Sequence, residues 1–290
     1  MASLETRARS KLKVNTKLLR RDIRRVEQMM RYRRYSLEGI PVLFANSFPK
    51  SGTHLLTQVL QGFTKIGPTV NSGLPAIVTF DSTTGEKREE EDIQRDLKRL
   101  LPGDIAYGHL QSTGAIMKYL CGDGIASYFI LRDPRDVVVS HVYYVTEIES
   151  NHVHHQYYME ELVDFDERIK TSILGRPDYG DLFPNIRGRF EPYLGWLDRP
   201  EILILRFEDF VNDRQKTIEL VFDHAVESGF PTAVNYQQSI EILSSGINPE
   251  KSPTFRSGKV GAWRVKFSKQ NIKLFEDVAG DLLDKLGYDW

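Results

Sequence analysis

The sequence predicts an α/β protein with a central parallel sheet flanked by helices. Four short apolar runs have the length of buried strands, and stretches with helical spacing separate them; the runs cover residues 42–46, 104–107, 127–132 and 201–205. Strands of a parallel sheet are covered on both faces, so they consist of almost continuous apolar residues. Their alternation with helical stretches favours one sheet with helices on both sides.

The composition is that of a soluble globular protein. The 290 residues include 40% hydrophobic and 27% charged side chains, and both values are ordinary. The one cysteine, Cys121, excludes an intramolecular disulfide and fits a reducing compartment. No apolar run approaches the ~20 residues of a membrane span, and no signal-peptide apolar region follows the N-terminus. We therefore expect a soluble, cytoplasmic protein.

Residues 1–40 form a basic helical segment ahead of an acidic domain at 41–290. The segment carries 12 Lys/Arg against 4 Asp/Glu, although the whole chain has a net charge of -1. Its apolar residues at helical spacing are Leu12, Leu19, Ile23, Val26 and Met30. This helix either contacts an anionic surface, membrane or nucleic acid, or docks on the domain with its arginines solvated or paired. Docking is favoured because charge runs are usually solvated faces, and nothing in the segment reads bases.

The first chemical motif follows the first predicted strand. Gly52 lets the backbone approach an anion closely, and Thr53 begins a helix whose free amides point at that anion. Ser51 and Thr53 add hydroxyl donors, and Lys50 adds a mobile positive charge. The lysine precedes the glycine here, whereas it follows the last glycine in nucleotide-triphosphatase loops. The stretch therefore predicts a phosphate loop of another kind.

The next strand ends at His109, after a segment of loop and helix. Residues 67–90 are rich in Pro, Gly, Ser and Thr and indicate a surface loop, and residues 91–101 indicate a helix. A residue at the exit of a buried strand lies on the edge where open sheets bind ligands. On these grounds alone, a single histidine is more often structural than catalytic.

A second motif runs from Arg132 to Ser140. Arg132 ends an apolar strand, Pro134 opens a helix, and Ser140 lies about two turns along it. A guanidinium suits a terminal phosphate because it donates two parallel charged hydrogen bonds. The alternative is a strand-to-helix turn whose charges simply pair with each other.

The stretch that follows mixes aromatic, acidic and histidine side chains. Residues 141–167 are rich in acids, and where such a stretch lines a pocket it favours a cationic or polyhydroxyl ligand over an anionic one. His152, His154 and His155 could bind a metal, but an exposed loop without a nearby cysteine or fixed carboxylate is the favoured interpretation. We expect no metal.

These motifs together resemble the PAPS-dependent sulfotransferase family, where PAPS is 3′-phosphoadenosine 5′-phosphosulfate. Pro49-Lys-Ser-Gly-Thr53 resembles the family's 5′-phosphosulfate loop, and the string from Arg132 to Ser140 resembles its 3′-phosphate site. Residues 254–267, Thr-Phe-Arg-Ser-Gly-Lys-Val-Gly-Ala-Trp-Arg-Val-Lys-Phe, resemble a third family motif. The resemblance covers roughly 42–267 and implies the P-loop-like sulfotransferase fold, a soluble cytosolic-type enzyme and PAPS as the donor.

The resemblance also implies roles for individual residues. His109 matches the general base, and Lys50 would stabilise charge on the leaving phosphate. The positions that match donor-binding residues are Lys50, Ser51, Gly52, Thr53, His54, Leu55, Arg132, Ser140, Phe207, Arg256, Ser257 and Gly258. Pro49, Tyr107 and Tyr144 would contact the acceptor, and residues 67–90 would help to cover it.

The chain departs from the family at several of these positions. Tyr107 stands where the family has a lysine, Phe207 where it has a tyrosine, and Ser257 where it has a lysine. The family's dimer motif would overlap residues 264–273, where Lys269 and Lys273 replace a valine and a glutamate. Dimerisation by that motif is therefore not expected.

The predicted function is transfer of a sulfuryl group from PAPS to a hydroxyl or amine of a small molecule. The sequence does not select among phenols, alcohols, amines and guanidinium compounds. One alternative is a nucleotide or small-molecule kinase, which would need the other lysine order and residues that hold Mg²⁺. The other is a non-catalytic nucleotide-binding or scaffold protein that uses the basic segment as its working surface.

Overall fold

The computed structural model describes residues 4–248, 250 and 258–290, with side chains described from residue 14 onward. Its strands are β1 (Val42–Ser47), β2 (Val70–Asn71), β3 (Ile77–Val78), β4 (Asp104–His109), β5 (Ile125–Leu131) and β6 (Ile202–Arg206). They form one sheet in the order β2-β4-β1-β5-β6, with β3 also paired to β4, and every pair is parallel. The four predicted strands and their parallel arrangement are confirmed.

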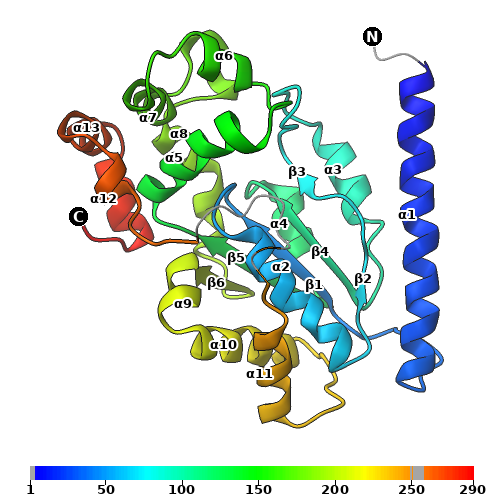
Figure 1. Ribbon diagram of the computed structural model, residues 1–290. Helices are drawn as coiled ribbons and strands as arrows, with labels where there is room; N and C mark the ends of the chain where they lie inside the picture. The colour runs from blue at the N-terminus through cyan, green and yellow to red at the C-terminus, as the bar shows by residue number, and fades with distance from the viewer. Residues whose placement is uncertain (1–3, 249, 251–257) are drawn as a thin grey trace.

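Helices surround this sheet, as Figure 1 shows. The α-helices are α1 (Leu4–Arg31), α2 (Thr53–Gly62), α3 (Glu90–Leu97), α4 (Gly114–Leu120), α5 (Pro134–Tyr143), α6 (His155–Glu160), α7 (Phe165–Leu174), α8 (Ile186–Phe190), α9 (Phe207–Asn212), α10 (Arg214–Glu227), α11 (Tyr236–Ser245), α12 (Trp263–Lys266) and α13 (Lys269–Leu286). The shorter turns are η1 (Phe63–Lys65), η2 (Tyr144–Ile148), η3 (Pro177–Leu182) and η4 (Glu191–Trp196). The predicted helix at 91–101 ends earlier, at Leu97, and the predicted loop at 67–90 contains the two short strands β2 and β3.

The sheet separates two apolar cores. Val42 and Phe44 of β1 pack into one core, together with residues of α3, α4, α5, α7, α8 and α13. Leu43 and Ala45 point the other way, into a core formed with α2, α10 and α11. Successive side chains of a strand alternate between faces, so a fully apolar strand is what two covered faces require.

The strand order fixes where a ligand can bind. β1 lies in the centre, with β4 on one side of it and β5 on the other. After β1 the chain first forms β2, β3 and β4 on one side of β1, and then β5 and β6 on the other side. The crevice at the carboxyl ends of such strands is the usual ligand site of an open α/β sheet. Residues that follow β1, β4 and β5 therefore meet at one edge.

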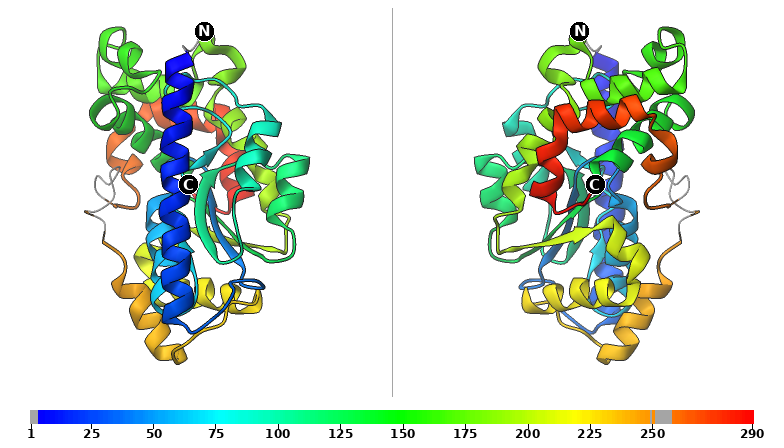
Figure 2. Two further views of the ribbon diagram at one scale, coloured as in Figure 1. Left: turned by 90° about the vertical axis from the view of Figure 1, so that its right-hand side faces the viewer. Right: turned by 90° about the vertical axis from the view of Figure 1, so that its left-hand side faces the viewer.

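The N-terminal helix α1 docks beside the sheet through its charged residues. Figure 1 shows α1 outside β2, and both views in Figure 2 show it running along most of the molecule. Arg21 and Arg25 form ion pairs with the buried Asp104, at 3.3 and 3.0 Å. Arg24 donates to the carbonyl oxygens of Asn71 and Ser72, each at 2.8 Å. The helix is thus docked with arginines paired to the domain.

The apolar stripe of α1 faces away from the domain. Leu19, Ile23, Val26 and Met30 are 50–69% exposed. An amphipathic helix ordinarily buries its apolar side, so this arrangement is the reverse of what the pattern predicts. The reason is Asp104, because a carboxylate buried at the start of β4 attracts the guanidinium side of the helix.

Candidate active site

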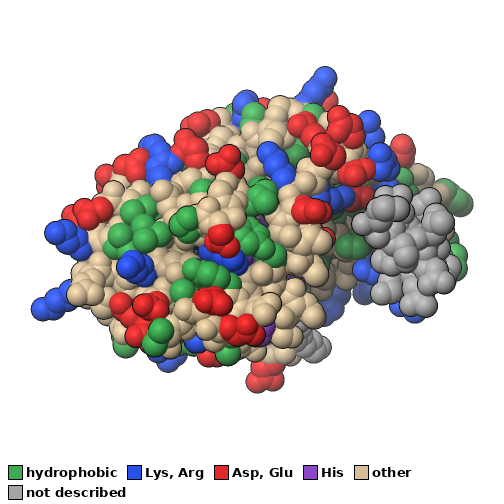
Figure 3. Space-filling model, turned by 90° about the horizontal axis from the view of Figure 1, so that it is seen from above, with side chains coloured by type: hydrophobic (Ala, Val, Ile, Leu, Met, Phe, Trp, Pro, Cys, Tyr) green, Lys and Arg blue, Asp and Glu red, His purple; other side chains and the backbone are tan. Residues whose placement is uncertain are grey.

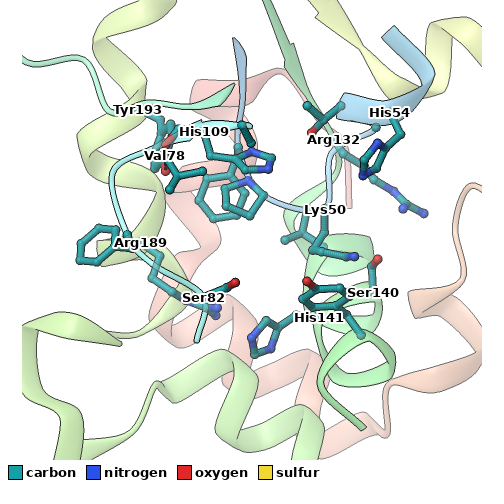
Figure 4. A pocket seen from close by; sticks show the side chains of 18 of the residues that line it. Lys50, His54, Val78, Ser82, His109, Arg132, Ser140, His141, Arg189 and Tyr193 are labelled. Carbon is teal, nitrogen blue, oxygen red and sulfur yellow. Dashed lines mark hydrogen bonds between the residues drawn. The ribbon is translucent and has the colours of Figure 1, made fainter. Parts of the chain in front are cut away.

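A cavity of about 660 Å³ lies at the carboxyl ends of β1, β4 and β5. Its lining brings together most of the residues that the sequence singled out, and Figure 4 labels ten of the lining residues. The predicted residues that line it are Pro49, Lys50, Gly52, Thr53, His54, Leu55, Tyr107, His109, Arg132, Ser140, Tyr144, Phe207 and Gly258. Ser51 is buried in the loop beneath it. Arg256 and Ser257 lie outside the described residues.

The loop after β1 leaves donors free for an anion. Gly52 has a φ of 101° and lies so close to Phe207 that a Cβ at this position would be 2.7 Å from the ring. No side chain caps α2, so the amides of its first turn have no partner within the helix. The Oγ of Ser51 is buried without a hydrogen-bond partner. Such a set of amides and a hydroxyl is a ready anion site.

Lys50 is a buried cation inside this loop. Its Nζ lies 3.7 Å from the centre of the ring of Tyr144, which is the first residue of the π-helical turn η2. Burial, helped by the charge of Arg132, lowers the pKa of Lys50 to about 7. Desolvation disfavours the ammonium form, and no carboxylate among the described residues forms an ion pair with it. A bound anion would therefore stabilise the protonated form.

His109 is held by the strand next to its own. Its Nδ1 lies 2.9 Å from Ser47 Oγ and 3.4 Å from the Ser47 carbonyl oxygen. The carbonyl can only accept, so this contact favours a proton on Nδ1 and leaves Nε2 as the acceptor. Figure 4 shows the ring directed into the cavity. Burial, with the charges of His54 and Lys50, lowers the pKa of His109 to about 4, so its imidazole is neutral at pH 7.

Arg132 lies on the other side of the loop, at the end of β5. It donates to Lys259 O at 2.8 Å, pairs with Asp136 at 3.3 Å and lies 4.4 Å from the Phe207 ring centre. Its Nε is buried and has no hydrogen-bond partner among the described residues. The amides of Gly261 and Trp263 donate to Asp136. This carboxylate therefore ties the segment after residue 257 to the strand that presents Arg132.

The neighbouring charges have a structural role. Asp133 caps α5 by accepting from the Arg135 amide and also pairs with the Arg135 side chain at 2.8 Å. The guanidinium of Arg135 stacks on Trp263, 4.0 Å from the ring centre. The alternative of a turn with paired charges therefore holds for both pairs, Asp133 with Arg135 and Arg132 with Asp136, and Arg132 also lines the cavity.

The histidines after α5 are not in an exposed loop, so that prediction is wrong. His154 is buried, His152 is half-buried, and both line the cavity with His141 of α5. The three rings are neighbours, with centroids 5.2–6.3 Å apart. Among the described residues no group of His, Cys, Asp and Glu has the arrangement to hold a metal ion. The absence of a metal stays a prediction.

The predicted acidic lining is also wrong. The side chains of Glu147, Glu160, Glu161 and Asp164 are exposed and lie outside the cavity. Figure 3 shows acidic side chains scattered over the outer surface among basic and apolar ones. The wall is formed instead by Val78, Phe80, Ser82 and neighbours from the 67–90 segment, and by residues of η3, α8 and η4. Because these acids lie on the exposed sides of helices and turns, the acidic composition of residues 141–167 does not predict which side chains line the cavity.

Sequence reasoning missed three residues of the site. Ser47 orients His109, and Arg189 of α8 lines the far wall of the cavity. Asp136 holds the closing segment, by which we mean residues 258–263. Ser47 could have been found, because it ends β1 immediately before the loop. Arg189 carries no local signal, since only the fold brings α8 to the cavity.

No helix in the described part of the chain combines the length and apolar character that crossing a membrane requires.

Comparison with solved structures identifies the class of fold. A mouse sulfotransferase crystallised with PAP superposes with a TM-score of 0.57 at 18% identity, covering 85% of this chain and 84% of that one. Retinol dehydratase in complex with retinol and PAP gives 0.53 at 19% identity, covering 86% and 82%. The fold is that of the P-loop-like sulfotransferases, as predicted.

Sequence comparison leads to the same family, although no family model matches the chain. A flavonol 3-sulfotransferase from Flaveria bidentis is 23% identical over 273 residues, 84% of this chain and 82% of that protein. A 3-alpha-hydroxysteroid sulfotransferase from Cavia porcellus is 21% identical over 164 residues. The chain spans about half the length of this relative, 53%. The resemblance to the PAPS-dependent sulfotransferase family is confirmed, and the chain is a homologue of these enzymes.

Proposed function

We propose that this protein is a PAPS-dependent sulfotransferase that transfers a sulfuryl group to a hydroxyl or amine of a small molecule. The observation that carries the proposal is the single cavity that joins the phosphate loop, His109 and Arg132. These groups come from three separate parts of the sequence. The homologous sulfotransferases and the PAP-bound neighbours in fold support the same donor. A cytoplasmic location stays a prediction.

The unpartnered groups of the cavity fit a donor with phosphate at two ends. The α2 amides and Ser51 Oγ would hold the 5′ end, and Arg132 Nε with Ser140 would hold the 3′-phosphate. Phe207 would pack against the base, and Gly258 would approach from the closing segment. The resemblance adds Arg256 and Ser257 to this set.

The chemistry that we propose needs one base and one cation. PAPS, when bound, supplies the sulfuryl group and leaves as adenosine 3′,5′-bisphosphate. Nε2 of His109 takes the proton from the acceptor as the acceptor atom bonds to sulfur and the sulfur–oxygen bond to the 5′-phosphate breaks. Lys50 stabilises the negative charge that develops on that phosphate oxygen. Tyr107, Tyr144 and Pro49 would position the acceptor.

The low pKa of His109 fits this role once the donor's charge is considered. The cation of Lys50 is among the causes that lower the pKa of His109 in the free protein. Burial is the largest cause and would remain, but a bound anion beside Lys50 would offset the contribution of the lysine's charge, so the pKa of His109 would rise. The imidazole would then become a stronger base only when the donor is in place.

The proposal is tested by binding and by transfer. Calorimetric titration with PAP should show binding, and incubation with PAPS and a pool of phenols, alcohols and amines should release PAP and form a sulfated product. ATP with Mg²⁺ in the same assay is the control for a kinase. Absence of PAP binding and of transfer would contradict the proposal.

His109→Ala should lower turnover by ~10²–10⁴-fold, because the reaction loses its proton acceptor. PAP affinity should be retained, since the loop and Arg132 are unchanged. The measurement is kcat with PAPS beside the dissociation constant of PAP. Unchanged turnover would show that His109 is not the base.

A further inference from the structure

The far wall of the cavity contains a second, half-buried cation. Arg189, on the short helix α8, lines the cavity, and Figure 4 shows it on the side away from Lys50 and Ser140. The donor groups lie around the phosphate loop, so this wall belongs to the space left for the acceptor. Arg189 is therefore a residue of the acceptor side.

The guanidinium of Arg189 is held in place but is not neutralised. It donates to the Ser172 carbonyl oxygen through Nη2, and its central carbon, Cζ, lies 4.4 Å from the centre of the Phe183 ring. Its Nε is buried, and no residue that the structure describes forms a hydrogen bond with it. None of the ion pairs in the described part of the chain involves it.

A nearby arginine shows the contrasting arrangement. Arg176 is paired with Asp178 and donates to His154 Nδ1 at 3.2 Å. Its charge is therefore balanced within the chain. Arg189 lies close enough to His154 to lower the pKa of that imidazole. No carboxylate in the described part of the chain forms an ion pair with Arg189. Two guanidinium groups thus lie near one histidine, and only one has a counter-charge.

His141 and His154, two neighbours of Arg189 in the cavity wall, are neutral imidazoles, and no ion pair in the described part of the chain joins Arg189 to Asp81 or Asp181, which also line the cavity. Burial, with the charges of Arg189 and nearby histidines among the further causes, lowers the pKa of His141 and His154. Neutral imidazoles can donate or accept hydrogen bonds but cannot balance a cation. An unpaired buried charge is unfavourable, so an anion entering this wall would be bound with a gain in free energy.

We propose that Arg189 binds an oxyanion of the acceptor, so that the acceptor is a small molecule with both a nucleophilic hydroxyl or amine and a carboxylate or similar group. This inference rests on the proposed function, which makes the cavity the acceptor's binding place. The oxyanion would pair with Arg189 on the far wall, while the nucleophilic group faces His109. Such an acceptor is anionic, whereas an acidic lining would favour a cationic or polyhydroxyl acceptor.

Matched pairs of ligands test the inference. The PAP-saturated protein is titrated with para-hydroxybenzoate and para-hydroxybenzamide, with para-hydroxyphenylacetate and its amide, and with an aliphatic hydroxy acid and its amide. A para-hydroxyphenyl phosphonate distinguishes a carboxylate from a phosphate-like group. The acids should bind roughly 10- to 100-fold more tightly than the amides, as expected of hydrogen bonds to charged groups. Turnover with PAPS should show the same ratio.

Variants assign the ratio to Arg189. Arg189→Gln should bring the acid-to-amide ratio close to one, and Arg189→Lys should restore part of it because the charge remains. Arg168→Gln is the matched control, since Arg168 also donates to a carbonyl oxygen, that of Tyr158, but does not line the cavity. Its ratio should equal that of the unmodified protein.

The outcomes separate the two proposals. Absence of any acid preference in the unmodified protein overturns this inference, even if Arg189→Gln fails to fold. A preference that survives in Arg189→Gln overturns it as well. Absence of PAP binding and of PAPS turnover contradicts the proposed function instead, because the acid and amide titrations can also be made without PAP.

Discussion

Two regions of the molecule bury positive charge in different ways. At the N-terminal helix, Arg21 and Arg25 reach the same carboxylate, Asp104, which also accepts from the Leu101 amide at 3.0 Å. Arg21 also pairs with Asp22, at 3.3 Å, so two carboxylates accompany the two guanidinium groups. At the sheet edge, Lys50 lies over the face of Tyr144, and no ion pair in the described part of the chain includes it.

The difference teaches how to distinguish a structural cation from a binding one. A buried charge needs a counter-charge or a set of hydrogen bonds. Where the chain provides these, as it does at Asp104, the cation fastens one element to another. Where the described chain does not, as at Lys50, we propose that the missing partner is a ligand. Both regions are rich in basic residues, so composition does not distinguish them.

The largest effect is expected from Asp104→Ala. The substitution leaves two buried guanidinium groups without their carboxylate, so the free energy of unfolding should fall by about 3–5 kcal/mol. Urea denaturation followed by circular dichroism measures it. Asp92→Ala is the matched control, because its ion pair with Arg95 is exposed and worth about 0–1 kcal/mol. A loss below about 1 kcal/mol for Asp104→Ala would show that the two regions do not differ.

The opposite sign is expected for Lys50→Met. Removing an unbalanced cation should leave the unfolding free energy of the ligand-free protein unchanged or raised, because the desolvation penalty disappears. PAP affinity should fall by roughly 10- to 100-fold, which corresponds to about 1.5–3 kcal/mol for a charged hydrogen bond. Calorimetry measures the dissociation constant.

Lys65→Met provides the control for that substitution. Lys65 is exposed and does not line the cavity, so neither stability nor PAP affinity should change. A clear loss of stability in Lys50→Met would mean that Lys50 is a structural cation like Arg21.

The pH dependence of PAP binding sharpens the same comparison. The pKa of Lys50 is about 7 in the free protein, against an ordinary 10.5. Between these values the unfolded chain binds a proton that the folded chain lacks, so the contribution of Lys50 to stability rises with pH across this window. PAP binding requires the proton, so affinity should fall by up to about tenfold per pH unit above pH 7.

Lys50→Arg should remove this dependence, because a guanidinium stays charged throughout the range. Titrations at pH 6, 7, 8 and 9 with both proteins decide the matter. Equal pH profiles for the two proteins would contradict the lowered pKa of Lys50.

The sequence predicted the sheet and the donor side because these depend on local patterns. The apolar runs mark strands with two covered faces. The loop after β1 needs a glycine at position 52, because a Cβ there would lie 2.7 Å from the Phe207 ring. The end of a parallel strand also predicts position, so His109 and Arg132 could be assigned to one edge before the structure was known.

The acceptor side could not be predicted, because it depends on packing between distant elements. Arg189 reaches the cavity only through the arrangement of α8, and the acids after Ser140 lie on the exposed sides of helices and turns. The prediction of an exposed histidine loop failed for the same reason. His154 is buried by contacts with Tyr179 of η3 and with Phe183, which follow it by more than twenty residues.

The smallest effect concerns the face of α1 that points to solvent. If the helix docks through Arg21 and Arg25, replacing Leu19 or Ile23 by Ser should change the unfolding free energy by no more than about 0.5 kcal/mol. Leu56→Ala is the contrast, because Leu56 on α2 is fully buried and should lose about 2–5 kcal/mol. A large loss at Leu19 would show that this stripe is buried after all. The helical spacing would then have predicted the docking face correctly. The pairing of Arg21 and Arg25 with Asp104 would no longer explain how α1 docks.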